Sequence, residues 1–430
     1  MNFELMHPAD QIVTIMERIY ACGMTTTSGG NLSVIDENGD IWITPGSVDK
    51  GSLTRDDIVR VTPSGEIIGK HNPSCELPFH SLLYKTRPDI KAILHAHPPA
   101  LVSYSIVRKV PNSKILSNIS SVCGKIGVAG YDIPGSIKLG ENIAKVFTDP
   151  EINTVMMDNH GVVVGHNSLF RAFMAFETFE YCARLEINSR IVGTPRVLSD
   201  KNIEAYETKV HPITEEFVPE YYSSDEKAIR RDMVKLIRRA YTQRLFSSTQ
   251  GTFSQRIDDN SFVITPYNKD RFYLEPEDLV TIRDGKKEAG KFPSRSALLH
   301  KYVYEKHPEI NSVIIAYPHN VMAFAATDAE FDSRTIPESY IQLRNVAKIP
   351  FGSSFMQPEM TADILSPSTP VALVENDCLI ATGTSLINAF DRLEVAEYTA
   401  MAIITSKQLG EIVKINDEQV QEINEAFNLQ

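Results

Sequence analysis

Cysteine, long apolar runs and positive charge are all scarce in this sequence, and each scarcity argues against a class of protein. The five cysteines are scattered and never form a CxxC pair, which favours a reducing compartment without a disulfide framework. No run of 18 apolar residues exists, and the N-terminus lacks the basic start and apolar stretch of a signal peptide. The net charge of −12 disfavours nucleic acid and anionic membranes as partners. The sequence therefore predicts a cytoplasmic protein.

Length and composition indicate a folded chain of more than one domain. Its 430 residues exceed what one ordinary core accommodates, which predicts two or three domains. The hydrophobic fraction of 42% and the charged fraction of 23% are typical of a soluble globular protein.

One pattern of residues occurs twice, which indicates a tandem duplication. The segment 27–33 matches 248–254, 221 positions later, and the segment 168–173 matches 385–390, 217 positions later. Between these ends the matches keep their order, which chance similarity does not do. They include Ile43-Thr44-Pro45 with Ile264-Thr265-Pro266, Pro73-Ser74 with Pro293-Ser294, His80 with His300, and Arg87-Pro88-Asp89-Ile90 with His307-Pro308-Glu309-Ile310.

The duplication predicts a first domain of residues 1–200, a linker of residues 201–226 and a second domain of residues 227–430. The linker region is rich in proline and acidic residues and has no counterpart in the repeat. Apolar periodicity predicts helices mixed with a largely antiparallel sheet, which is typical of a layered α/β or α+β fold. In the first half the expected helices cover residues 9–22, 74–86 and 169–192, and the expected strands cover 31–35, 41–44, 92–97 and 154–157.

Three histidines of the first half are candidate metal ligands. His95 and His97 end an apolar strand, where residues at i and i+2 share one face, and His160 follows a second apolar strand. Three imidazoles with an open position are typical of a catalytic zinc site rather than a structural one. In the second half these positions and that of Glu76 hold Ile315, Tyr317, Asp377 and Ser296. Loss of a single metal site explains the joint replacement.

Glu76 admits two interpretations from its position. It lies three residues after a proline at an expected helix start, where a carboxylate favours the positive end of the helix dipole. Its loss together with the histidines favours a general acid/base beside the metal, or a fourth ligand when no substrate is bound. The glycine-rich and hydroxyl-rich loops near it lack nucleotide-binding patterns, but their backbone N–H groups suit a phosphate or carboxylate as well as an ordinary turn.

Together these motifs resemble the class II aldolase/adducin family, which includes L-fuculose-1-phosphate aldolase. The resemblance covers about residues 8–189 and, more weakly, 227–408. It implies two tandem three-layer α/β/α domains, one zinc or manganese ion per chain in the first, and fourfold assemblies with active sites between subunits. Two chains would then close a pseudo-tetramer. The residues that carry it are Gly30-Asn31-Leu32-Ser33, Ile43-Thr44-Pro45, Pro73-Ser74-Cys75-Glu76 with His80, His95-Ala96-His97 and Asn159-His160-Gly161.

The resemblance also implies roles for individual residues. His95, His97 and His160 would bind the metal, and Glu76 would be the catalytic acid/base. Two departures matter: Cys75 replaces a serine of the phosphate site, and Leu116 and Ser117 occupy the region of a tyrosine that the aldolases borrow from a neighbouring subunit. The expected substrate or phosphate contacts are Ser28, Gly29, Asn31, Gly46, Ser47, Ser74 and Cys75.

Glutamate at position 76 favours carbon–carbon cleavage, because the related epimerases carry aspartate there. The metal would hold the oxygens of a keto-sugar or sugar phosphate and stabilise the enediolate left by retro-aldol cleavage. Epimerisation and keto-acid decarboxylation on the same fold remain alternatives, as does an adducin-like interaction protein without catalysis. The second half is expected to serve packing in a homo-oligomer, or else to sense an anion through Arg295.

Overall fold

The computed structural model describes residues 3–429 and divides the chain into two compact units. The first comprises Met1–Ser113 and Ile119–Arg184, and the second comprises Lys114–Asn118 and Leu185–Gln430. The division falls inside helix α6 (Leu169–Val192), so the linker residues belong with the second unit. The predicted domain boundaries at residues 200 and 227 mark the limits of the sequence repeat, whereas the two units are defined by contacts within the fold. Those boundaries therefore stay a prediction.

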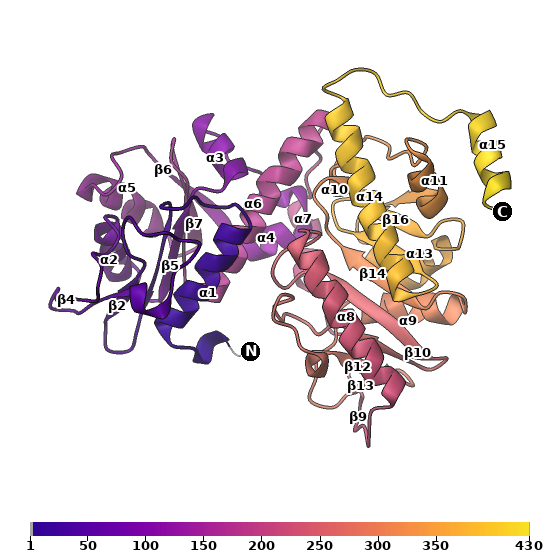
Figure 1. Cartoon of the computed structure of the whole chain (residues 1–430), viewed down its shortest axis with the longest axis horizontal. Coiled ribbons are helices and arrows are strands. Elements are labelled where there is room, and N and C mark those ends of the chain that lie inside the picture. The colour runs from indigo at the N-terminus through magenta and orange to yellow at the C-terminus, as the bar shows by residue number, and fades with distance from the viewer. Residues whose placement is uncertain (1–2, 430) are drawn as a thin grey trace. The chain divides into compact units, whose positions relative to one another are not determined.

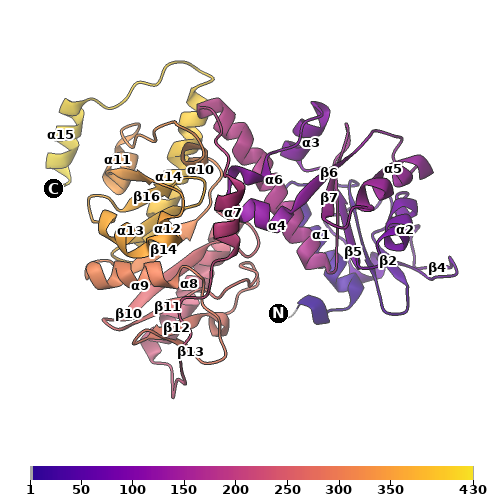
Figure 2. The same cartoon turned by 180° about the vertical axis from the view of Figure 1, so that it is seen from behind.

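The first unit is built on an eight-stranded sheet (Figures 1 and 2). Its strand order is β4-β3-β2-β1-β5-β8-β7-β6, and every neighbouring pair is antiparallel except β6 with β7. The strands are β1 (Asn31–Ile35), β2 (Ile41–Ile43), β3 (Val59–Val61), β4 (Ile67–Ile68), β5 (Ala92–Ala96), β6 (Lys125–Ala129), β7 (Ile152–Met157) and β8 (Val162–His166). The helices are η1 (Phe3–Leu5), α1 (Pro8–Ala21), η2 (Arg55–Asp57), α2 (Leu77–Thr86), α3 (Pro99–Ile106), η3 (Ser113–Ile115), α4 (Ser117–Cys123), α5 (Ile137–Phe147) and α6.

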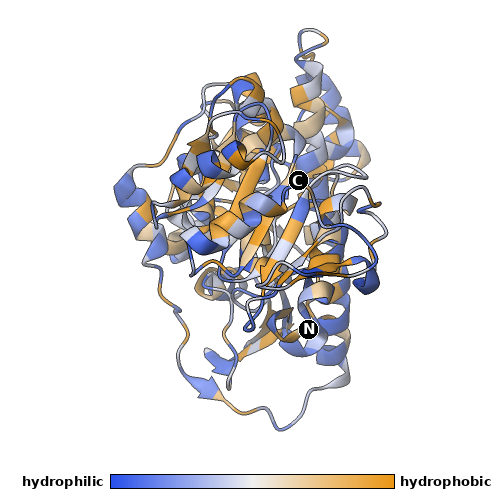
Figure 3. Cartoon of the chain, turned by 90° about the vertical axis from the view of Figure 1, so that its left-hand side faces the viewer, coloured by the Kyte–Doolittle hydropathy of each residue, from blue (hydrophilic) through white to orange (hydrophobic). Residues whose placement is uncertain are grey.

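Apolar faces of the helices explain the layers of this unit. On one face of the sheet, α2 and α5 bury Leu83 and Ile143 in a core shared with the strand residues Ile93 and Val155. On the other face, α1 packs against β1 and β2 through apolar residues at helical spacing, among them Ile12. The strands carry mostly hydrophobic residues, as Figure 3 shows. The result is a helix–sheet–helix sandwich.

The second unit repeats this plan around a nine-stranded sheet. Its order is β15-β16-β17-β14-β10-β11-β12-β13-β9, antiparallel except for β15 with β16 and β13 with β9. The strands are β9 (Glu216–Phe217), β10 (Thr252–Asp258), β11 (Ser261–Ile264), β12 (Val280–Arg283), β13 (Lys286–Glu288), β14 (Ser312–Ala316), β15 (Val346–Ile349), β16 (Val371–Val374) and β17 (Leu379–Gly383). The helices are α7 (Asp200–Glu207), α8 (Ser224–Thr242), η4 (Pro276–Asp278), α9 (Ala297–Lys306), α10 (Val321–Ala325), α11 (Pro337–Leu343), α12 (Ser353–Met356), α13 (Pro358–Ile364), α14 (Leu386–Ser406) and α15 (Asp417–Ala426).

The expectation of two α/β/α domains with largely antiparallel sheets is confirmed. Helix 169–192 and strand 31–35 match the prediction residue for residue. The helix expected from residue 74 begins instead at Leu77, because Glu76 is its N-cap, and the strand expected to reach His97 ends at Ala96. The predicted linker contains α7 and β9. None of the helices within residues 3–429 is long and apolar enough to cross a membrane.

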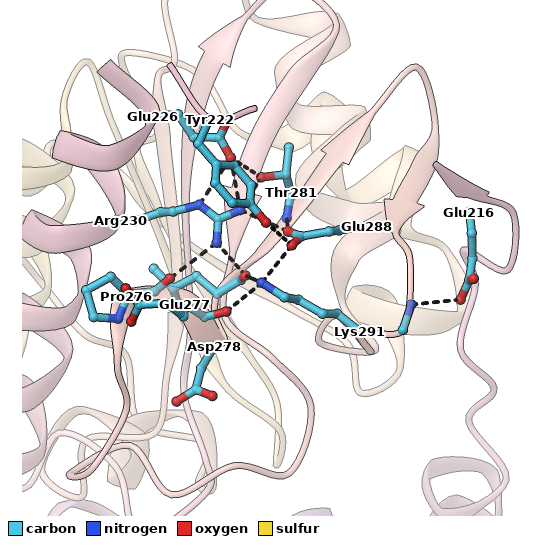
Figure 4. Close-up of polar contacts among 12 residues, drawn as sticks. Glu216, Tyr222, Glu226, Arg230, Pro276, Glu277, Asp278, Thr281, Glu288 and Lys291 are labelled. Atoms are coloured by element: carbon cyan, nitrogen blue, oxygen red, sulfur yellow. Dashed lines mark hydrogen bonds and ion pairs between the residues drawn. The ribbon is translucent and has the colours of Figure 1, made fainter. Parts of the chain in front are cut away.

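A buried charge network fixes α8 to the sheet of the second unit (Figure 4). Arg230, 3% exposed, contacts Glu226 and Glu288 with nitrogen–oxygen distances of 2.9 Å. Its guanidinium also donates to Thr281 Oγ1 at 2.6 Å and to the carbonyl oxygen of Leu279 at 2.7 Å. One buried cation therefore contacts two buried carboxylates, Lys291 also contacts Glu288 at 2.7 Å, and the network joins α8 to β12 and β13.

We expect Arg230→Met to destabilise the second unit by about 3–5 kcal/mol, because it leaves the buried Glu226 without its close cation and removes one of the two cations that contact Glu288. Calorimetric unfolding of the whole chain measures the change. Arg231→Met is the matched control, since that side chain is 60% exposed, and it should stay within about 0.5 kcal/mol of wild type. Equal effects of the two substitutions would contradict this account of the network.

Candidate metal centre

Three histidines converge in the first unit because of where their strands end. His95 lies on β5 and His97 one position past its end, so both side chains leave the sheet on the same side. His160 lies in the turn between β7 and β8. Strand β8 pairs with β5, with Val162 opposite Ala96, and this register brings the turn beside the first two histidines.

The three imidazoles form a compact cluster whose ligand atoms all lie within 4.8 Å of one another. The ring centroids are 4.7 Å apart for His95 and His97, and 4.9 Å apart for His95 and His160. His95 is fully buried, and its Nδ1 lies 2.9 Å from the carbonyl oxygen of Val162. Because a carbonyl only accepts, Nδ1 carries the hydrogen and Nε2 keeps its lone pair for a ligand.

Burial keeps these histidines neutral. The pKa of His95 is well below its ordinary value because the ring is buried and, secondarily, because His97 and His160 lie beside it. Burial also lowers the pKa of His97 and of His160, while the Glu76 carboxylate opposes both shifts. Neutral imidazole is the form that binds a metal ion.

Glu76 faces the histidine cluster from the N-terminus of α2. Its carboxylate is 5% exposed, with Oε2 lying 3.3 Å from His95 Nε2 and Oε1 lying 3.8 Å from His160 Nε2. Asn31, opposite His95 in the register of β1 and β5, donates from Nδ2 to Oε2 at 2.6 Å. The side chain therefore occupies a place from which it can bind an ion or exchange a proton with a substrate.

Three buried atoms of this cluster lack a hydrogen-bond partner among residues 3–429: His95 Nε2, His160 Nδ1 and Glu76 Oε1. Each unsatisfied group costs about 1–3 kcal/mol, so native proteins seldom leave several together. Zinc accepts imidazole nitrogens and carboxylate oxygens, the two kinds of atom that this cluster leaves without partners. The residues present therefore fit a divalent metal ion.

The residues predicted to surround a phosphate are brought together only in part. Gly29 lies against His97, because a side chain at Gly29 would come within 3.3 Å of His97 Nδ1. Gly46 lies against the backbone around Ser74, whose Oγ accepts from the amide of Glu76 at 3.3 Å. The remaining predicted contacts besides Asn31 are the exposed residues Ser28, Ser47 and Cys75. Their phosphate role stays a prediction.

Lys50 is a residue of this region that the sequence reasoning missed. Its ammonium is 2% exposed and donates to the carbonyl oxygen of Pro45 at 2.5 Å, while its backbone amide donates to that of Thr27 at 2.8 Å. Lys50 thus joins the two loops predicted to hold the phosphate, one through its ammonium and the other through its backbone amide. The repeat offered a signal, because Arg271 occupies the same position and makes the same backbone contact to Ser248.

The second unit keeps the framework without the ligands. Asp377, at the position of His160, is buried and accepts hydrogen bonds from the hydroxyls of Ser354 at 2.5 Å and Ser117 at 3.4 Å. Ser117 and Leu116, which replace the expected tyrosine region, are both fully buried. In the described part of the chain, the histidine cluster is the one group of three side chains placed to hold a metal.

Residues of the predicted linker lie against the replaced positions of the second unit. Lys209 places its Nζ 3.9 Å from the centroid of the Tyr206 ring and 3.8 Å from that of Phe355. Burial lowers the pKa of Lys209 to about 8, an effect that the Asp377 carboxylate partly offsets. Arg295 donates through Nη1 to the carbonyl oxygen of Lys209 at 3.3 Å. One of the five N–H groups of Arg295 is therefore used by the backbone, and anion sensing stays a prediction.

Both halves of the chain are similar in sequence to known proteins. The sequence profile of the "Class II Aldolase and Adducin N-terminal domain" matches residues 10–187 and 231–404, which are most of the chain. A 5-deoxy-D-ribulose 1-phosphate aldolase of Bacillus thuringiensis serovar kurstaki is 29% identical over 203 residues, covering 46% of this chain and 93% of the relative. An L-fuculose phosphate aldolase of Methanocaldococcus jannaschii is 33% identical over 187 residues, covering 42% of this chain and 97% of the relative. A 3-oxo-tetronate 4-phosphate decarboxylase of Pectobacterium atrosepticum is 30% identical over 179 residues, covering 41% of this chain and 81% of the relative.

We expect the purified chain to bind one divalent metal ion, and His95→Ala to lose it, because the variant removes one of three nitrogens from the cluster. Elemental analysis after dialysis measures the stoichiometry. His319→Ala is the control, since His319 lies in the second unit and should leave the content unchanged. Two ions per chain, or full metal content in His95→Ala, would contradict the assignment.

Proposed function

The chain belongs to the class II aldolase and adducin family, and from that premise we propose that its first unit is a metal-dependent lyase. The proposed reaction is retro-aldol cleavage of a small keto-sugar phosphate into an aldehyde and a shorter ketone. Two of the similar proteins are named as sugar-phosphate aldolases, which supports this reaction and a phosphorylated substrate. The metal ligands in the proposal are His95, His97 and His160, and the acid/base is Glu76.

The observation that carries the proposal is the placement of one carboxylate against neutral imidazoles. Glu76 lies 3.3 Å from His95 and 3.8 Å from His160, at a buried site whose polar atoms are incompletely satisfied by the protein. A purely structural carboxylate would pair with a cation or with several N–H groups instead. A bound divalent ion would supply Lewis acidity that polarises the substrate carbonyl.

Glu76 has the position to move the proton that the cleavage requires. Retro-aldol cleavage removes a proton from a hydroxyl group, breaks the adjacent carbon–carbon bond, and returns a proton to the carbon that keeps the electron pair. We assign that return to Glu76, whose Oε1 is free of hydrogen bonds from residues 3–429 while Asn31 holds Oε2. Oε1 is thus available to exchange a proton, and the hydrogen bond to Oε2 fixes the orientation of the carboxylate.

Decarboxylation of a keto acid is the second candidate. Loss of carbon dioxide leaves the same electron-rich carbon as retro-aldol cleavage and calls for the same protonation by Glu76. The similarity to a 3-oxo-tetronate 4-phosphate decarboxylase supports it. Glutamate at position 76 still favours the aldolase over the epimerase alternative, and the intact histidine cluster favours an enzyme over an adducin-like interaction protein.

A substrate screen distinguishes these reactions. The full chain, loaded with zinc or manganese, is incubated with ketose phosphates, their unphosphorylated forms and 3-oxo acid phosphates, while aldehyde and carbon dioxide are both measured. We expect aldehyde release from a phosphorylated ketose. Carbon dioxide release alone would favour the decarboxylase, and turnover of none of these compounds by the metal-loaded chain would overturn the proposal.

Glu76→Gln should retain the metal but lower kcat by ~10²–10⁴, because the nearly isosteric amide cannot shuttle a proton. Steady-state kinetics and metal analysis of the same preparation measure both effects. Glu66→Gln, at an exposed position of the same unit, is the control and should match wild type. Activity of Glu76→Gln within about threefold of wild type would show that Glu76 serves only the helix start, since proton transfer contributes far more than that.

A further inference from the structure

A buried chain of side-chain hydrogen bonds leads to the proposed catalytic carboxylate. The hydroxyls of Tyr84 and Ser33 are 2.7 Å apart, and Ser33 Oγ lies 2.7 Å from His80 Nδ1. His80 Nε2 lies 2.5 Å from Asn31 Oδ1, and Asn31 Nδ2 lies 2.6 Å from Glu76 Oε2. Ser33 and His80 are fully buried, and the other three are at most 6% exposed. This series of hydrogen bonds therefore runs through buried side chains from the sheet and α2 to the site.

The ionised carboxylate sets the direction of every link in this chain. Glu76 can only accept, so the amide nitrogen of Asn31 donates to it and Asn31 Oδ1 faces His80. His80 Nε2 must then carry the hydrogen, and Nδ1 of the neutral ring accepts from the Ser33 hydroxyl. Ser33 in turn accepts from Tyr84. Burial lowers the pKa of His80 and raises that of Tyr84, which keeps both in the neutral forms that this direction requires.

The second unit retains the tyrosine, serine and histidine of this hydrogen-bond series but lacks its asparagine and glutamate. Ser254 Oγ lies 2.6 Å from both His300 Nδ1 and the Tyr304 hydroxyl, as their counterparts do in the first unit. Thr252 and Ser296 replace Asn31 and Glu76, and His300 Nε2 has no hydrogen-bond partner within residues 3–429. The histidine thus supports the fold in both units, but it directs an amide toward a carboxylate only in the first.

We propose that His80 is a positioning residue for catalysis, because it holds the Asn31 amide in the one orientation that donates to Glu76. This inference rests on the proposed function. The opposite amide orientation would place Asn31 Oδ1 against the carboxylate, where two acceptors repel. With the hydrogen on His80 Nε2, that rotation would lose the Asn31 hydrogen bonds to both His80 and Glu76, so one oxygen of Glu76 stays fixed by the Asn31 amide.

The duplication supplies a matched control for the test. His80→Leu and His300→Leu remove the same ring from the same hydroxyl partner in the two units. We expect similar losses of thermal stability and unchanged metal content in both variants. In His80→Leu alone, kcat should fall about 10–100-fold with little change in KM, the usual effect of removing a residue that orients a catalytic group. His80→Gln, whose amide can donate to Asn31 and accept from Ser33, should recover most of the activity.

Equal kinetic effects of the two leucine variants, no fall in kcat in His80→Leu, or no recovery in His80→Gln would each overturn the proposal. A crystal structure of His80→Leu gives a readout independent of activity: the Asn31–Glu76 hydrogen bond should be broken or the Asn31 side chain rotated. If wild type cleaves none of the sugars, the proposed function fails, and that structure alone decides whether His80 orients Asn31. An unchanged Asn31–Glu76 contact there would refute the positioning role.

Discussion

The hydrogen bond from Asn31 to Glu76 links the sheet of the first unit to the carboxylate that faces the histidine cluster. Asn31 begins β1 opposite His95 on β5, and Glu76 caps α2, so this contact connects the strand beside β5 to the helix whose N-terminus holds the proposed acid/base. The carboxylate sits where burial would otherwise raise the cost of its charge. The Asn31 amide supplies a hydrogen bond to this buried carboxylate and fixes its orientation.

The second unit shows what the same framework does without that contact. Its sheet and its Ser254–His300–Tyr304 hydrogen bonds persist, while Ile315, Tyr317 and Asp377 take the positions of the three histidines. Lys209 and Tyr206 from the predicted linker contact each other and interact electrostatically with Asp377. Packing requirements were thus retained after the chemical requirement was lost, which is why the two halves agree in core and turn residues and differ at the site.

The spacing of apolar residues along the sequence predicted those helices and strands whose formation depends on neighbouring residues. The spacing of apolar residues gave the bounds of α6 and β1, and the i, i+2 spacing of His95 and His97 gave their common face. Long-range packing escaped that reasoning. The helix α7 forms in the predicted linker because Ser199 caps it and Ile203 and Tyr206 become buried. The role of His80 depends on partners 47 and 49 positions away, which no single motif reveals.

The central claim is that one metal site, in the first unit, performs the reaction of the whole chain. Titrating the metal-free full-length protein with zinc or manganese, while following aldehyde release from the ketose phosphate found in the screen, tests this most directly. The account predicts no activity without metal and a linear rise that stops at one equivalent per chain. Full activity in the metal-free protein, or a rise that continues to two equivalents, would contradict it.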